Sequence, residues 1–329
     1  MLPVFTFPIT ISPFIKSLTE AITHGAICAN CTHVFAHMNN DKALRKAMLE
    51  YFMRKELTLS KKHMYKQDYV ESAQILYGAY TTPTSENLLS RLLTDTLDYP
   101  AEYEDSGLSA RAFLNNFILR HYPNEMAIKT SFVDNVLLKQ GKTNVAVFEL
   151  SVGKSRVDIC KINGGSAAFE IKTDLDNFTR LERQLANYYE IFECVSVIIS
   201  ESRWQFLPDY VPAYCGIYSY RQRKDGKCNF ILRRAPIKQF AFDSHKQLSI
   251  VSKSALAHKA SACTSLSTTE IIDQCLAMYD RDEINRFFKN YLRQRYGKHW
   301  EFLREHNADI YEIDYEWFFR NNLEPAIIY

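Results

Sequence analysis

Hydrophobic positions recur with helical spacing near both ends of the chain and with strand-like spacing in the middle. Residues 41–80 are rich in Lys, Leu, Met and Tyr and contain no proline, a composition that favours helix. A short helix is predicted at 86–97. Ser109 provides an N-cap for another helix that should end at Tyr122. A further helix is predicted at 125–138.

Short runs rich in β-branched or aromatic residues follow, and each has the length of a strand. They cover 144–150, 156–162 and 167–172, and the Asn163-Gly164-Gly165 turn predicts a hairpin between the last two. A helix is predicted from Asp176 to Phe192, because its apolar residues recur at three- and four-residue steps. The apolar run Cys194–Ser200 is typical of a strand buried on both faces. A second hairpin is predicted from residues 216–220 and 228–232 around Asp225-Gly226.

The C-terminal third begins with a stretch rich in Ser, Ala and Lys, residues 242–268, which we expect to be a loop. Two helices should follow, because Ser267 with Glu270 and Asp280 with Glu283 have the spacing of capping boxes. Gly297 is expected to end the second helix.

The order of elements in the middle of the chain predicts the fold class and the domains. A succession of helix, three strands, helix and strand favours an α/β fold with a central mixed sheet flanked by helices. We therefore expect three regions: a helical N-terminal region at 1–108, the α/β domain at 109–240, and a basic linker with a helical C-terminal region at 241–329.

Composition narrows the possible classes of protein. The 329 residues are 47% hydrophobic and 24% charged, which excludes a disordered chain, and the net charge of +2 excludes a uniformly basic coat protein. No uncharged apolar run reaches about 18 residues, so no membrane span is expected. The eight cysteines show no disulfide-framework spacing, which favours a reducing cytoplasm.

Positive charge is concentrated after the predicted sheet. Residues 220–260 include ten Lys and Arg residues but only two acidic ones, both Asp. Such an excess suits a phosphate backbone, although a solvated flexible face has the same composition. The candidate nucleic-acid contacts are Arg221, Arg223, Lys224, Arg233 and Arg234, together with Arg180 and Arg183 of the predicted helix 176–192.

Three ionisable residues should meet on one face of the predicted sheet. Side chains alternate along a strand, so Glu170 and Lys172 point away from Phe169 and Ile171, and Asp158 should stand beside them across the hairpin. Two carboxylates in apolar surroundings repel each other unless a cation compensates. Mg²⁺ or Mn²⁺ would do so, with the Ile171 carbonyl as an extra ligand. The alternative is an exposed cross-strand ion pair.

This arrangement resembles the PD-(D/E)XK nuclease superfamily, whose signature is an Asp at the end of one strand and Glu-x-Lys on the next. Asp158 and Glu170-Ile171-Lys172 match it, although Val157 stands where the signature has proline. The resemblance covers about residues 109–234 and is greatest to the bacterial and phage sce7726 family. It implies a restriction-endonuclease-like core and a Mg²⁺-dependent hydrolase, an endonuclease that cleaves phosphodiester bonds with a metal-activated water.

The resemblance also implies supporting residues. Gln184 and Tyr188 form a Gln-xxx-Tyr motif found in RecB-like members, and they share one helical face. Their implied role is to orient Lys172 and to contact the nucleic-acid backbone. The family often adds one more acidic residue. Glu149 is the first choice for this metal ligand and Glu125 the second.

Other functions stay open at this stage. The superfamily mostly cuts DNA, so DNA is favoured, but the residues themselves do not exclude RNA. A non-cleaving regulator or a defence or toxin component on the same fold is the main alternative. The helical extensions are the expected place for a homo-oligomer contact or a protein partner. Cys28, Cys31, His33 and His37 have the spacing of a zinc site, but they also fit an apolar packed segment.

Overall fold

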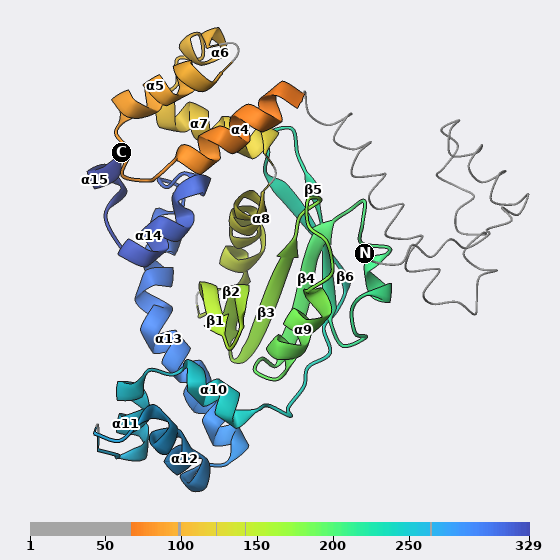
Figure 1. The fold of residues 1–329 in the computed structure, drawn as a ribbon, viewed down its shortest axis with the longest axis vertical. Coiled ribbons are helices and arrows are strands. Elements are labelled where there is room, and N and C mark those ends of the chain that lie inside the picture. Colours follow the sequence, from red (N-terminus) through yellow and green to blue (C-terminus); the bar gives the residue numbers. More distant parts are fainter. Residues whose placement is uncertain (1–66, 98–99, 123, 142, 264) are drawn as a thin grey trace, which may run out of the picture. The chain divides into compact units, whose positions relative to one another are not determined.

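Six strands form a single mixed sheet in the computed structural model, which describes residues 67–329 apart from 98–99, 123, 142 and 264 (Figure 1). The described residues belong to one compact unit, Leu57–Tyr329. The strands lie in chain order across the sheet: β1 (Val145–Val152), β2 (Ser155–Asn163), β3 (Gly165–Lys172), β4 (Cys194–Ser200), β5 (Gly216–Gln222) and β6 (Cys228–Arg234).

Strand directions confirm the mixed α/β class. β1, β2 and β3 run antiparallel, β3, β4 and β5 run parallel, and β6 returns antiparallel to β5. Both predicted hairpins are present. In the second hairpin Gly226 has a φ of +84°. A Cβ at this position would lie 2.4 Å from the Leu119 carbonyl, so this close approach requires glycine.

The sheet forks between β2 and β3. The two strands pair from Ile159–Phe169 to Asn163–Gly165 and no further. Beyond that point β2 pairs with β1, while β3 continues beside β4 as far as Lys172. Polar side chains can enter the gap between the diverging strands, and this gap contains the candidate site.

Two helices lie against opposite faces of the sheet near the fork. Phe132, at the end of α8 (Glu125–Phe132), packs against Phe169 of β3. α9 (Leu181–Tyr189) brings Tyr188 to Glu170, which points to the other face. The helix predicted at 125–138 is α-helical only to Phe132. It continues as the π-turn η1 (Val133–Leu137) and the 3-10 turn η2 (Leu138–Gln140).

The N-terminal helices have a small core of their own. Leu76, Leu93 and Ile118 are among its buried residues. Ser109 caps the last helix as predicted, since its Oγ accepts the Ala112 N–H at 3.2 Å. The helices are α4 (Gln67–Ala79), α5 (Glu86–Thr96), α6 (Ala101–Glu104) and α7 (Ala110–His121). The rest of the helix predicted at 41–80 lies outside the described residues.

The predicted loop at 242–268 is wrong, because it contains two helices. Asp243 caps α10 (Ser244–Ile250) and Ser252 caps α11 (Lys253–Ala260). Leu248 and Leu256 are fully buried, so tertiary packing stabilises segments whose composition is that of a loop.

The predicted end at Gly297 is also wrong. Both predicted capping boxes are present, at the starts of α12 (Thr268–Met278) and α13 (Arg281–His306), but α13 passes through Gly297. Trp300 and Leu303 continue its buried stripe. Burying one such side chain contributes about 1.5–3 kcal/mol, more than the ~1 kcal/mol that a helical glycine costs.

The remaining described elements are short. They are η3 (Leu207–Asp209), η4 (Glu312–Asp314), α14 (Tyr315–Asn321) and α15 (Pro325–Ile328). None of the helices in the described ranges combines the length and the apolar character that a membrane crossing needs.

Candidate active site

Asp158 occupies the fork in the sheet. Its side chain is only 8% exposed, and its Oδ2 accepts the backbone N–H of Ile171 at 2.6 Å. Burial raises the pKa of this carboxyl well above its usual range, and the neighbouring carboxylates of Glu170 and Glu125 raise it further. The ionised form of Asp158 therefore needs additional positive charge.

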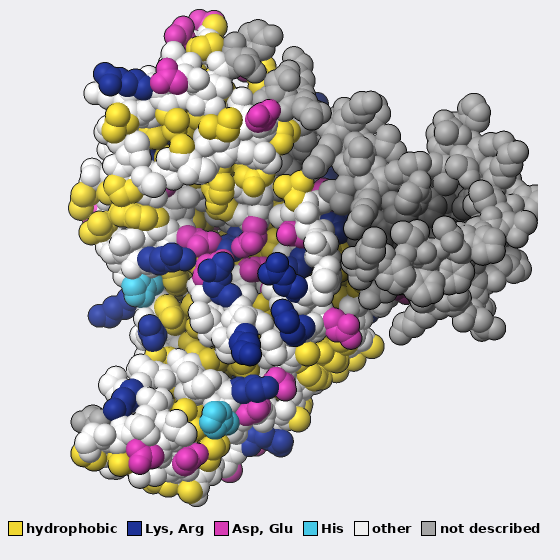
Figure 2. All heavy atoms as spheres, in the orientation of Figure 1, with side chains coloured by type: hydrophobic (Ala, Val, Ile, Leu, Met, Phe, Trp, Pro, Cys, Tyr) yellow, Lys and Arg dark blue, Asp and Glu magenta, His cyan; other side chains and the backbone are white. Residues whose placement is uncertain are grey.

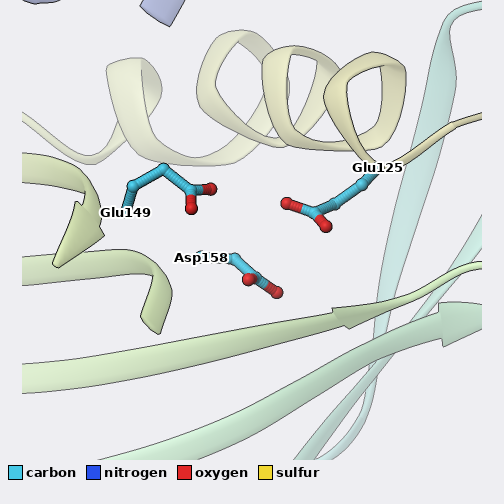
Figure 3. A group of neighbouring side chains, drawn as sticks. All are labelled: Glu125, Glu149 and Asp158. Atoms are coloured by element: carbon cyan, nitrogen blue, oxygen red, sulfur yellow. The ribbon is translucent and has the colours of Figure 1, made fainter. Parts of the chain in front are cut away.

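Three carboxylates converge beside the fork. Figure 3 shows Glu125 and Glu149 pointing toward each other with Asp158 beside them, and one ligand oxygen from each of the three lies within 4.8 Å of the others. Glu149 comes from β1, Asp158 from β2 and Glu125 from the first turn of α8. The structure thus brings together both candidates for the additional acid, the preferred Glu149 and the second choice Glu125.

The backbone at Glu149 is unusual. Its φ is +55°, inside a strand whose neighbouring pairs, Phe148–Ile159 and Leu150–Val157, keep one register. A non-glycine residue in this region carries strain of about 1–3 kcal/mol. The conformation occurs at the residue opposite Asp158, so the strain lies within the acid cluster.

Lys129 neutralises much of the cluster. Its buried ammonium contacts Glu149, Glu316 at 2.7 Å and Glu125 at 3.0 Å. Burial alone would lower the pKa of Lys129, but the surrounding carboxylates outweigh burial and raise the pKa. Neither Lys129 nor Glu316 was among the residues predicted for the site. Lys129 could have been found from the sequence, because it lies four residues after Glu125 on a predicted helix and so shares its face. Glu316 lies on α14, far along the chain, and no local pattern links it to the site.

A second group of polar side chains lies near Asp158, on β3 and α9. Lys172 Nζ donates to Glu170 Oε1 at 2.6 Å and to Gln184 Oε1 at 3.3 Å. The Tyr188 hydroxyl lies 2.8 Å from Glu170 Oε2 and 2.6 Å from the carbonyl oxygen of Arg156. Burial raises the pKa of Glu170 despite Lys172. The four candidates Glu170, Lys172, Gln184 and Tyr188 are therefore in contact.

The helix that carries Gln184 and Tyr188 starts later than predicted, at Leu181 rather than Asp176. Asp176 Oδ2 accepts both the N–H and the hydroxyl of Thr173, at 2.8 and 2.7 Å. This local turn uses the polar side chains that otherwise favour a helix start.

An open pocket of about 450 Å³ lies over the acid cluster, with Glu125, Glu149, Lys129 and Arg156 in its lining. Thr173 and Asp176, from the segment after β3, line it too. In Figure 2, Asp and Glu side chains gather near the middle of the displayed face, with Lys and Arg side chains below them. A ligand in the pocket would reach Glu125 and Glu149.

The donor set fits a hard divalent cation, because Glu125, Glu149 and Asp158 offer only carboxylate oxygens. Glu149 already has cationic partners in Lys129 and Arg156, whose Nε lies 2.5 Å from Glu149 Oε2. Within the described residues Asp158 forms no salt bridge. Glu170, a predicted ligand, does not belong to this three-carboxylate group. Ile171 contacts Asp158 through its N–H rather than its carbonyl.

The basic candidates of the second hairpin are largely neutralised. Arg221 lies 3.6 Å from Glu201, and Arg223 pairs with Asp225. Arg233 pairs with Glu201 and lies 4.8 Å over the Trp204 ring. Arg234 donates to the backbone carbonyls of Cys215 and Pro212, at 2.7 and 3.0 Å. Only Lys224, Arg180 and Arg183, among these described candidates, are exposed and form no salt bridge.

The zinc candidates Cys28, Cys31, His33 and His37 lie outside the described residues.

We compared the chain with known protein families, sequences and structures. No curated protein sequence matches the chain. A solved structure, the SPO1766 protein of unknown function from Silicibacter pomeroyi, is similar at 16% identity and a TM-score of 0.26, over 34% of this chain and 70% of that chain. The family model described as bacteriophage P4 protein cII matches residues 120–315, a span that contains all six strands and the three converging carboxylates. Because this match covers more than half of the sequence, the chain belongs to the bacteriophage P4 protein cII family.

Proposed function

We propose that the protein is a metal-dependent nuclease with a PD-(D/E)XK core that hydrolyses phosphodiester bonds, in DNA before RNA. The succession of α8, three antiparallel strands, α9 and the parallel strand β4 supports the core assignment. Asp158 at the fork and the Glu170–Lys172 pair on the adjacent strand support the active-site assignment.

The protein's own acids would hold the cation. Asp158, Glu149 and Glu125 supply carboxylate oxygens, and Glu170 lies on the neighbouring strand. Bound there, Mg²⁺ or Mn²⁺ would lower the pKa of a water molecule and neutralise charge on the phosphate oxygens.

Lys172 is the group that acts on the attacking water or on the developing negative charge. An ammonium has three N–H donors. Glu170 and Gln184 accept two of them, so the third can be donated to a water or to a phosphate oxygen. Tyr188 contacts Glu170 and so helps to fix the carboxylate that orients Lys172.

The proposal rests mainly on one observation, the uncompensated negative charge of the buried Asp158 carboxylate. It is a buried carboxylate beside Glu125 and Glu149, and it forms no salt bridge within the described residues. Burial raises its pKa, and so do the carboxylates of Glu170 and Glu125. A cation at this position would remove the electrostatic conflict, and the pocket over the cluster gives a substrate access to it.

A second function has its own support. Lys129 and Arg156 already balance Glu149, so much of the cluster is compensated without a metal ion. Such a site suits a protein that binds nucleic acid on this fold without cutting it.

Cleavage assays separate the two functions. The full chain is incubated with plasmid, linear duplex, single-stranded DNA and tRNA, in Mg²⁺ or Mn²⁺ and in excess EDTA. The nuclease proposal expects cleavage that chelation abolishes. Binding without cleavage in either metal would favour the second function, and undiminished cleavage in EDTA would refute the metal mechanism.

A further inference from the structure

A second pocket lies beyond the β1–β2 turn from the acid pocket. It has a volume of about 340 Å³, and the turn, α9 and α10 all contribute to its lining. Its charged side chains are Lys154, Arg183, Lys246 and Glu190. Three cations and one carboxylate give it the opposite character to the acid pocket, so its ligand should be an anion.

Local structure fixes the positions of these cations. β1 and β2 pair as far as Val152–Ser155, so Gly153 and Lys154 form a two-residue turn, in which Gly153 has a φ of +59°. The Asn187 side-chain amide donates to Ser155 Oγ at 2.8 Å and ties this turn to α9, one turn of helix from Arg183. The basic pocket is thus held by contacts between its elements.

The cations differ in how far they are already neutralised. Lys246 pairs with Glu190 and lies 3.8 Å from Asp243. Lys154 and Arg183 are exposed, and neither forms a salt bridge in the described ranges. A phosphate can therefore bind them without first displacing a carboxylate, whereas Arg223 and Arg233 of the second hairpin would have to release one.

The two pockets are close along the chain. Arg156 lines the acid pocket and Lys154 lines the basic one. Two residues span at most about 7 Å of chain. Successive nucleotides of one DNA strand rise by about 3.4 Å. A strand with its reactive phosphate over the acid cluster would therefore present a nearby phosphate of the same strand to the basic pocket.

We infer that the basic pocket is a backbone-binding subsite that holds a phosphodiester next to the cleaved one, with Lys154 and Arg183 as its contacts. The inference rests on the proposed nuclease function, because the substrate it names is a polynucleotide. It makes the path across the β1–β2 turn, rather than the β5–β6 hairpin, the main nucleic-acid contact of the described chain.

The test measures binding without cleavage. Fluorescence anisotropy of a labelled 20-nucleotide strand and of its duplex is followed in EDTA over a range of salt concentrations, with the full chain. Charge reversal at two phosphate contacts, in Lys154→Glu with Arg183→Glu, should weaken binding by about 10-fold or more and lower the salt slope by about 1.5. Arg91→Glu with Lys298→Glu makes the same charge change at exposed positions far along the chain and should have little effect.

Each outcome decides the inference. Unchanged affinity and slope in the first variant, an equal loss in the control variant, or no binding by the wild type would overturn it. A labelled mononucleotide that binds as tightly as the 20-nucleotide strand, with the same dependence on Lys154 and Arg183, would overturn the polynucleotide assignment. Selective loss of binding, combined with no cleavage by the wild type in Mg²⁺, would keep the subsite and reject the nuclease function. Cleavage by the variant with an unchanged KM would keep the nuclease and reject the subsite.

Discussion

The two lysines near Asp158, Lys129 and Lys172, lie in opposite kinds of environment. Lys172 is 12% exposed and contacts one carboxylate and one amide, from its own strand and from α9. The Lys129 side chain is 3% exposed and contacts three carboxylates from α8, β1 and α14. The first lysine keeps one N–H that neither of these partners accepts. The second has each of its three N–H donors matched by a carboxylate.

This difference suggests a division of labour. A lysine enclosed by acids stabilises the folded state and sets the charge of the cluster, but it has no donor to offer a substrate. A lysine at the edge of the cluster can act on one. The comparison predicts that Lys129 matters most for stability and that Lys172 matters most for turnover.

The largest effect should come from the carboxylate between the two lysines. Asp158→Asn keeps an oxygen for the Ile171 N–H but removes the charge that would bind the metal. A lost metal ligand removes several kcal/mol of transition-state stabilisation, so cleavage should fall by roughly 10³-fold, and Mn²⁺ binding should weaken. Asp273→Asn on the exposed face of α12 is the matched control. Full activity of Asp158→Asn would remove this residue from the mechanism.

The stability of lysine variants tests the comparison directly. Lys129→Met leaves three carboxylates without their cation, and breaking a buried ion pair in this way costs about 3–5 kcal/mol. Lys172→Met removes a partner from one acid that Tyr188 still contacts, so we expect a loss nearer 1 kcal/mol. Urea unfolding of both variants, with and without Mg²⁺, measures the difference. Equal losses would show that the two environments are equivalent.

A buried acid that is bound by a hydroxyl should make the stability of the protein depend on pH. Asp134 accepts a hydrogen bond from the Tyr315 hydroxyl at 2.9 Å, and burial raises its pKa from 3.8 to about 6. The folded state therefore holds this proton more tightly than the unfolded state. The resulting stability is complete below pH 3.8 and is lost as the pH rises through about 6.

Asp134→Asn replaces the protonated acid with a group that does not titrate. The variant should exceed the wild type in unfolding free energy by on the order of 2 kcal/mol at pH 8, and the gain should vanish near pH 4. Urea unfolding at the two pH values measures it. A difference that does not change with pH would mean that Asp134 has an ordinary pKa.

The strands of the sheet could be predicted from the sequence more completely than the helices around it. All six strands and both hairpins were predicted, because each strand is a short run of β-branched, aromatic or apolar residues and glycine-containing turns separate the paired ones. The helices α10 and α11 have no such pattern. Leu248 and Leu256 become buried only when the C-terminal region packs together, so their composition alone predicted a loop.

In the candidate site, too, local contacts could be predicted from the sequence and long-range contacts could not. The contact of Lys172 with Glu170 and Gln184 was predictable from strand alternation and from helical spacing. The contact of Lys129 with Glu316 was not, because it joins residues 187 positions apart in the chain. The positive φ of Glu149 was equally hidden, since nothing in the residue type favours it.

The most direct test of the account is a pair of measurements on Lys172→Ala, which deletes the ammonium and keeps every carboxylate of the cluster. We expect a folded protein that binds Mn²⁺ and nucleic acid as the wild type does, and that cleaves on the order of 10²-fold more slowly or worse in single-turnover reactions. Nucleic-acid binding should survive because most phosphate contacts lie outside the site. A folded variant that binds nucleic acid and cleaves at the wild-type rate would contradict the central role assigned to Lys172.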